Sequence, residues 1–181
     1  MASRFLAVIP SPSMAALFYH DALTALSLAG TRFVVVGGMA VNLQGVQRAT
    51  ADLDIAIALD AVSLRRAVTA LGTLGLRPIL PVQLEQIMDP AVVQSWIDEK
   101  NLRAIAFHHP NNPLQEIDLL VAALVPYEEI EKTADKMTVG TLSFAVASIP
   151  MLIRLKTGTH RAQDASDVEA LRKIQEAEAN E

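Results

Sequence analysis

Apolar and polar residues follow two different periods along this chain, and together they predict a mixture of helices and strands. Residues 13–29 carry apolar side chains at helical spacing, and Gly30 suits the position after the last turn. Residues 32–38, RFVVVGG, predict a short buried strand that runs into two glycines. Residues 39–45 predict a helix of about two turns that the closing glycine ends.

The same alternation continues to the end of the chain. Strands are predicted at 53–59, 101–107 and 114–123, with a hairpin over 136–147; helices are predicted at 61–75, 91–100, 149–158 and 160–178. Gly140 suits the turn of the hairpin, residues 108–113 have the Pro and Asn content of a loop, and Ser148 suits a helix N-cap. Strands that alternate loosely with helices, with hairpins between them, predict an α+β fold with a mixed sheet.

The segment RATADLDIAIALD, residues 48–60, places two carboxylates at the start of an apolar strand. Because side chains alternate between the faces of a strand, Asp52 and Asp54 share one face with Ala56 and Ala58. The opposite face is fully apolar and suits packing against helices. The acidic face becomes small after the carboxylates, which leaves room above it.

The strand predicted at 114–123 repeats this pattern. Glu116 and Asp118 share one face, and the residues between and after them are apolar. If this strand is a neighbour of the one that carries Asp52 and Asp54, the acids of the two strands converge on one open side of the sheet.

Converging carboxylates need something to offset their repulsion. Two ionised carboxylates about 5 Å apart repel by roughly 3 kcal/mol at an effective dielectric near 20, and a domain is stable by only ~5–15 kcal/mol. Raised pKa values, basic partners or a divalent cation would each suffice. Oxygen ligands suit Mg²⁺ or Mn²⁺. A purely structural interpretation stays open, in which Asp52 caps a turn and Asp54 bonds to Arg48 or Thr50.

Composition narrows the class of protein. The 181 residues suit one domain, 51% of them are hydrophobic and only 4% aromatic, so we expect an aliphatic core. The formal net charge of −5 argues against a protein that coats nucleic acid. The chain has no cysteine, which excludes disulfides, thiolate metal sites and cysteine nucleophiles.

No apolar stretch approaches the roughly 18 residues of a membrane span, so we expect no membrane partner. Pro10 and Pro12 interrupt the short apolar run near the N-terminus, and we interpret residues 1–13 as the start of a soluble protein without a signal peptide. We therefore expect a cytoplasmic protein.

The two glycines suit a ligand site as well as a tight turn. Glycines between a strand and a helix let a ligand approach the backbone, and a helix N-terminus offers free N–H groups to an anion. A strand-to-helix turn also needs glycine for purely steric reasons. The combination is more specific than the pair alone, because thirteen residues separate Gly38 from Asp52 and a third strand acid follows.

This combination resembles the nucleotidyltransferase superfamily that includes DNA polymerase beta. The chain is most similar to the AbiEii-like nucleotidyltransferases of abortive-infection and toxin–antitoxin loci, on the segments GGMAVNLQGVQRATADLD, EIDLL and MLIRLKTGTHRAQDASDVEAL. The resemblance extends from about Arg32 to Leu171. It implies that Asp52 and Asp54 bind two divalent ions, Mg²⁺ or Mn²⁺, and that Asp118 shares the ion that activates the attacking hydroxyl.

The resemblance also implies a nucleotide site. Gly37 and Gly38 would hold the triphosphate, and Lys156, Arg48 and Arg161 match basic positions that contact phosphate. The acids of the C-terminal motif, Asp164 and Asp167, would be structural or partly catalytic.

We therefore expect a metal-dependent transfer of a nucleoside monophosphate from an NTP to an acceptor hydroxyl, in a toxin–antitoxin or abortive-infection system with a cognate partner protein. A tRNA end, a protein hydroxyl or a small molecule such as an antibiotic remains open as the acceptor. The alternative is a non-catalytic nucleotide-binding or antitoxin-like module on the same fold; intact Asp52, Asp54 and Asp118 favour the enzyme.

In the expected architecture, residues 1–181 form a single domain, with an N-terminal helix at 13–30, a core sheet over 31–147 and C-terminal helices at 148–178. Helices pack on one face of the mixed sheet, and a metal-nucleotide cleft opens on the other.

Overall fold

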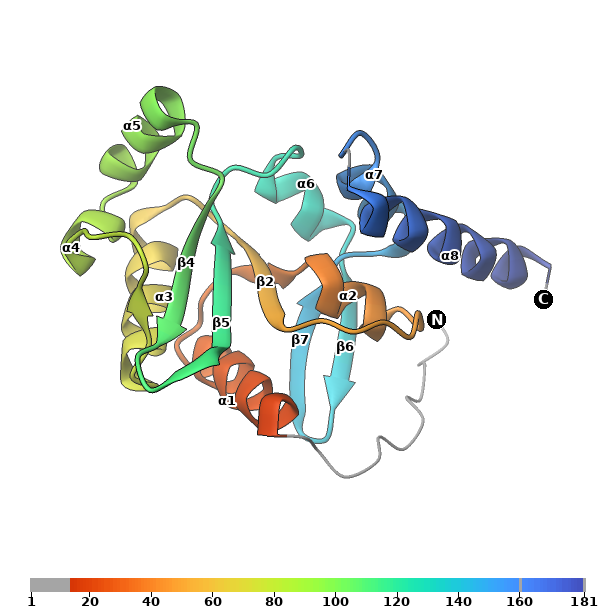
Figure 1. Cartoon of the computed structure of the whole chain (residues 1–181), viewed down its shortest axis with the longest axis horizontal. Helices are drawn as coiled ribbons and strands as arrows, with labels where there is room; N and C mark the ends of the chain where they lie inside the picture. The colour runs from red at the N-terminus through yellow and green to blue at the C-terminus, as the bar shows by residue number, and fades with distance from the viewer. Residues whose placement is uncertain (1–13, 160, 181) are drawn as a thin grey trace.

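The computed structural model in Figure 1 describes residues 14–159 and 161–180. The interpretation of residues 1–13 as a start without a signal peptide lies outside the described residues, as does the predicted helical residue His160. None of the helices in the described ranges is long and apolar enough to cross a membrane.

Seven strands of the described chain form one mixed sheet in the order β3-β4-β5-β2-β1-β7-β6. Their bounds are β1 Phe33–Val35, β2 Asp52–Ile57, β3 Arg77–Pro78, β4 Ala104–His109, β5 Asn112–Leu120, β6 Asp135–Val139 and β7 Leu142–Val146. The pairs β2–β5 and β1–β7 are parallel, and the other four pairs are antiparallel. The predicted α+β class with a mixed sheet is confirmed.

Helices surround the sheet. Their bounds are α1 Met14–Leu28, α2 Gly37–Leu43, α3 Ala61–Thr73, α4 Leu84–Ile87, α5 Pro90–Lys100, α6 Tyr127–Lys132, α7 Ile149–Lys156 and α8 Ala162–Ala179. Helices α1 and α3 pack against each other, and α1 also contacts β5 and β7. Helix α2 contacts β2 and α7, and α7 packs against α8 at the C-terminal end (Figure 1).

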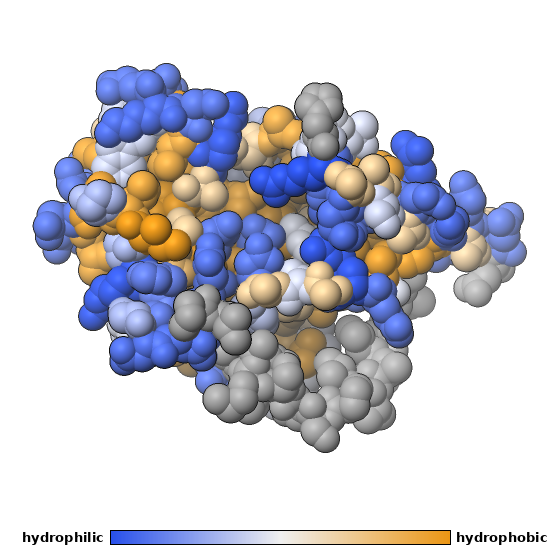
Figure 2. Space-filling view, viewed as in Figure 1, coloured by the Kyte–Doolittle hydropathy of each residue, from blue (hydrophilic) through white to orange (hydrophobic). Residues whose placement is uncertain are grey.

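The two faces of β2 behave as the alternation of the sequence predicts. Leu53, Ile55 and Ile57 are buried in the aliphatic core, whereas Asp52 and Asp54 on the other face are half-buried. Figure 2 shows hydrophilic side chains over α4 and α5 and along α8, with apolar surface between these regions.

Three short elements were not predicted: β3, α4 and α6. Each has six residues or fewer, so it is too short to show a period in the sequence. The loop expected at 108–113 is also much shorter in the structure, because β4 continues to His109 and β5 begins at Asn112. Backbone pairing between these two strands extends over residues whose Pro and Asn content favours a loop.

Candidate active site

The predicted convergence of the acids is confirmed by the pairing of β2 with β5. These neighbouring strands are parallel, and their register places Asp54 opposite Asp118 and Asp52 opposite Glu116. Asp52, Asp54 and Asp118 each offer a carboxylate oxygen, and these three oxygens lie within 4.8 Å of one another. We call these three residues the acid triad.

Few groups of the protein offset the charge of the acid triad. Thr50 donates a hydrogen bond of 3.0 Å to Asp52 Oδ1, and the backbone N–H of Gly38 donates to Asp54. Asp118 Oδ1 is buried and has no hydrogen-bond partner among the described residues. No lysine or arginine of the described chain forms an ion pair with the triad.

The structural interpretation therefore assigned the wrong partners to Asp54. It required a bond from Asp54 to Arg48 or Thr50, but Thr50 binds Asp52, and Arg48 pairs with Asp167. The donor set that remains consists of carboxylate oxygens, one of them buried and unpartnered, and this set fits a hard divalent cation such as Mg²⁺ or Mn²⁺.

The electrostatics of the triad reflect this lack of partners. Burial, and then the negative charges of Asp52 and Asp118, raise the pKa of Asp54 to about 6, although Gly38 and Lys156 act in the opposite direction. Burial also raises the pKa of Asp118, with Glu116 and Asp52 adding to it. Both shifts mean that the metal-free site resists the ionisation of its own carboxylates.

The contribution of Asp54 to the stability of the metal-free protein should consequently fall as the pH rises from about 4 to about 6. Asp54 binds its proton more tightly in the folded chain, with a pKa of about 6, than in the unfolded chain, with a pKa of about 4, so this contribution is complete below pH 4 and lost through pH 6. Asp164 and Asp167 act in the opposite direction, because their pKa values are lowered in the folded chain. Urea unfolding of the wild type and of Asp54→Asn at pH 4, 5, 6 and 7 in EDTA isolates the contribution of Asp54. A difference between the two proteins that does not change over this range would contradict the repulsion inferred for the triad.

The two glycines are required by the side chains that face them. Gly37 has a φ of +62°, and a Cβ on it would lie 1.8 Å from Asp54 Oδ2. A Cβ on Gly38 would lie 2.6 Å from Thr50 Oγ1 and 3.0 Å from Arg48 Cζ. The steric explanation of the glycine pair therefore holds, and at Gly37 the side chain that requires the glycine belongs to the acid triad. The N–H of Gly38 is already used by Asp54, so it is not free in the metal-free protein.

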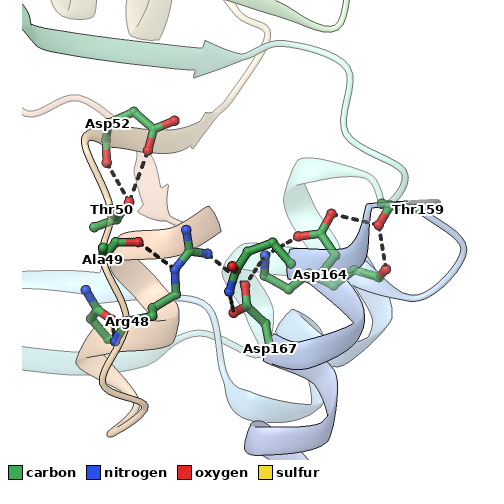
Figure 3. Close-up of polar contacts among 10 residues, drawn as sticks. Arg48, Ala49, Thr50, Asp52, Thr159, Asp164 and Asp167 are labelled. Carbon is green, nitrogen blue, oxygen red and sulfur yellow. Dashed lines mark hydrogen bonds and ion pairs between the residues drawn. The ribbon is translucent and has the colours of Figure 1, made fainter.

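Two of the predicted phosphate-binding cations, Arg48 and Lys156, lie in a second polar cluster; Figure 3 shows Arg48, Asp164 and Asp167 of this cluster on one side of Asp52. We call this group the Lys156 cluster; its members are Arg48, Lys156, Asp164 and Asp167. Lys156 Nζ lies 2.6 Å from Asp164 Oδ1 and 2.8 Å from Asp167 Oδ2, and Arg48 Nη1 lies 2.8 Å from the same oxygen of Asp167. The cluster joins the segment before β2 to α7 and α8, and its formal charges sum to zero.

The Lys156 cluster is buried. Lys156 is 9% exposed and Asp167 1%, so Lys156 is not an ordinary surface lysine. Burial opposes the ionisation of Asp164 and Asp167, but hydrogen bonds from Lys156, Thr159 and Gln163 outweigh it, and the pKa of each carboxyl lies below its ordinary value. Lys156 is also close enough to the triad to lower the pKa of Asp54.

Arg161 lies at the edge of this cluster rather than inside it. It is exposed at the N-terminus of α8, where its charge lowers the pKa of Asp164. The structure thus brings Gly37, Gly38, Arg48 and Lys156 next to the acid triad and leaves Arg161 at the rim.

One further side chain near the triad could not be identified from the sequence. Tyr19 of α1 is 5% exposed, and its hydroxyl donates a hydrogen bond to the carbonyl of Ala51. Burial, and then the charges of Asp52, Glu116 and Asp54, raise its pKa to about 12. In the sequence this tyrosine looks like any apolar position of an amphipathic helix.

Comparison with solved structures identifies the fold. No family model and no curated protein sequence matches the chain. The lincomycin-bound crystal structure of the lincosamide antibiotic adenylyltransferase LnuA aligns with a TM-score of 0.59 over 90% of this chain and 98% of that one, at 14% identity. The chain has the nucleotidyltransferase fold.

Two further solved structures share this nucleotidyltransferase fold. ANT(2")-Ia in complex with adenylyl-2"-tobramycin aligns with a TM-score of 0.53 at 11% identity, over 89% of this chain and 94% of that one. An antigenic nucleotidyltransferase-like protein from Paracoccidioides brasiliensis aligns with a TM-score of 0.50 at 16% identity, over 93% and 88%. At these identities the likeness concerns the fold, and the chemistry has to be argued from the residues of this chain.

Proposed function

We propose that this protein transfers a nucleoside monophosphate from an NTP to a hydroxyl of an acceptor, with Mg²⁺ or Mn²⁺ held by Asp52, Asp54 and Asp118. The observation that carries the proposal is the acid triad: three carboxylate oxygens lie within 4.8 Å of one another, one triad oxygen is buried without a partner, and no lysine or arginine of the described chain pairs with the triad. A protein gains nothing from such a group unless a cation binds it.

In this reaction the acceptor oxygen forms a bond to the α-phosphorus, the bond from that phosphorus to the β-phosphate oxygen breaks, pyrophosphate leaves and the hydroxyl proton is released. Bound divalent ions supply the charge that polarises the α-phosphate and lowers the pKa of the attacking hydroxyl. The residues of the chain mainly position the reactants and neutralise charge.

The surroundings of the triad suit a nucleotide on the side of α2 and α7. Gly37 and Gly38 keep the backbone close to Asp54, and Arg48 and Lys156 lie beside it. We propose that these four residues, with Arg161 at the rim, face the triphosphate. Asp164 and Asp167 hold Lys156 and Arg48 in place, so the cations are positioned before the nucleotide arrives.

Two classes of acceptor are supported by different resemblances. LnuA is named as a lincosamide antibiotic adenylyltransferase, and ANT(2")-Ia was solved in complex with adenylyl-2"-tobramycin. These two fold neighbours favour a small molecule that carries hydroxyl groups as the acceptor. The motif resemblance to AbiEii-like proteins favours a toxin–antitoxin setting, in which a tRNA end or a protein hydroxyl is modified and a cognate protein controls the activity.

The test measures metal-dependent nucleotide binding and transfer together. We expect calorimetry to show at least tenfold tighter NTP binding with Mg²⁺ than with EDTA, and α-labelled NTP to label an acceptor in a mixture of tRNA, protein and small molecules. Asp118→Asn should lose both effects. Equal NTP affinity with and without the metal argues against the site, and metal-dependent binding with no labelled product in any fraction favours the non-catalytic module.

A further inference from the structure

A cavity of about 100 Å³ lies at the C-terminal ends of β2 and β5, beyond the triad, where Ala56 and Ile57 of β2 and Leu120 and Val121 line it. In the register of β2 and β5, Ala56 pairs with Leu120, and this pair is the next one on the same face after Asp54 and Asp118. Both residues line the cavity. The small side chain of Ala56 therefore leaves room, as its alternation with the carboxylates predicts.

The cavity has one aromatic wall, which belongs to α6 and is fixed at two points. Tyr127 donates a hydrogen bond of 2.9 Å to Glu131 Oε1, and the guanidinium of Arg32 lies 5.4 Å from the centre of the Tyr127 ring. Arg32 is itself paired with Glu131. A ring that is already immobile loses little further freedom when a ligand stacks on it.

The other side chains that line the cavity are apolar, although polar atoms make up about half of its surface. Ala123, Val125 and Ile130 also line the cavity, and Val125 and Ile130 are almost fully buried. Leu124, between two of these lining residues, is 66% exposed. The result is an open cavity with mostly apolar side chains and one tyrosine in its lining, one pair of the β2–β5 register beyond Asp54 and Asp118.

We propose that this cavity holds the base of the NTP; the inference rests on the proposed function. The cavity has about two-thirds of the volume of the ~150 Å³ cavity that holds benzene in an engineered protein, so at most one ring of a base enters it, and the rest of the base lies at the open side. Two residues of a strand span about 6.6 Å, which leaves room for a ribose between this ring and the triad. Stacking on one aromatic ring typically changes affinity about tenfold or more.

The first experiment needs neither metal nor phosphate. Adenosine, guanosine, cytidine and uridine are titrated into the whole protein, and methyl NMR signals of Ala56 and Ile130 are followed. We expect at least one nucleoside to shift these signals. Tyr127→Phe keeps the ring and should retain the affinity within about twofold, whereas Tyr127→Leu should lose about tenfold. Ala123→Leu, which fills the cavity, should lose binding, and Ala91→Leu on the exposed start of α5 should not.

The second experiment distinguishes the base of the NTP from a base of the acceptor. With Mg²⁺ present, the wild type should bind NTP about tenfold more tightly than inorganic triphosphate, and Ala123→Leu and Tyr127→Leu should each reduce this ratio to about one.

Three results overturn the proposal: no nucleoside shifts the cavity signals, both cavity variants keep the nucleoside affinity, or the wild-type ratio is already one, which assigns the cavity to the acceptor. If neither NTP nor triphosphate binds with Mg²⁺, the proposed function fails, and the metal-free titration still decides whether the cavity takes a base.

Discussion

Asp54→Asn should make the metal-free protein more stable by about 1–2 kcal/mol at pH 7.5 while removing the transfer activity proposed above. Asp54 is the triad member whose pKa is raised to about 6 by burial and by two neighbouring carboxylates, so at pH 7.5 it is ionised against both. Asparagine keeps the shape and can still accept the hydrogen bond from Gly38. It cannot supply the charge that a divalent cation requires.

Three measurements test this prediction. Urea unfolding in EDTA at pH 7.5 should show the gain in stability, and at pH 4.5 the gain should largely disappear because wild-type Asp54 is then protonated. Thermal unfolding with Mg²⁺ and NTP should show no stabilisation of the variant. The rate of nucleotide transfer should fall by at least about 10²–10³-fold, as it does when a group that stabilises charge in the transition state is removed.

Glu116→Gln is the matched control. Glu116 lies on the same face of β5, opposite Asp52 in the register, but it is not a member of the triad. Removing the charge of Glu116 also makes this face less negative and weakens the repulsion between Glu116 and the Asp118 carboxylate. We expect a small gain in metal-free stability with metal-dependent stabilisation retained. Should Asp54→Asn instead destabilise the metal-free protein by several kcal/mol, Asp54 is a structural acid, and the metal site is wrong.

The period of the sequence predicts the acid triad because a strand has only two faces. Once Asp52 and Asp54 are placed on the face opposite the apolar residues, their direction is fixed, and the same holds for Asp118. Which strands are neighbours is a separate matter. The parallel pairing of β2 with β5, three strands later in the chain, depends on how β3 and β4 pass to the edge of the sheet, and no local pattern encodes this.

The environment of Lys156 could not be predicted by the same reasoning. Its burial results from the angle at which α8 returns against α7, which places Asp164 and Asp167 around one amine. The spacing of these three residues in the sequence is equally compatible with an exposed surface. Tyr19 shows the same limit, because its contact with Ala51 depends on how α1 lies beside β2.

Lys156→Met should destabilise the protein by about 3–5 kcal/mol, the typical effect of removing one partner from a buried ion pair. Lys156 is the shared partner of Asp164 and Asp167, both of which are buried. Asp167 keeps Arg48 and Gln163, but Asp164 keeps only the hydroxyl of Thr159 among the described side chains that hydrogen-bond to it. Methionine matches the length of lysine, so the lost charge is the main change.

Lys173→Met on α8 is the control for this prediction. Lys173 pairs with Glu169 one helical turn away, both side chains are 71% exposed, and its loss should change stability by less than about 0.5 kcal/mol. Asp164→Asn should recover part of the stability lost in Lys156→Met, because the double variant no longer buries an unpaired carboxylate. Urea unfolding of the wild type, Lys156→Met, Asp164→Asn and the double variant gives the coupling free energy between the two residues directly. A Lys156→Met protein as stable as Lys173→Met would mean that the amine is exposed in solution and that the Lys156 cluster does not hold α7 to α8.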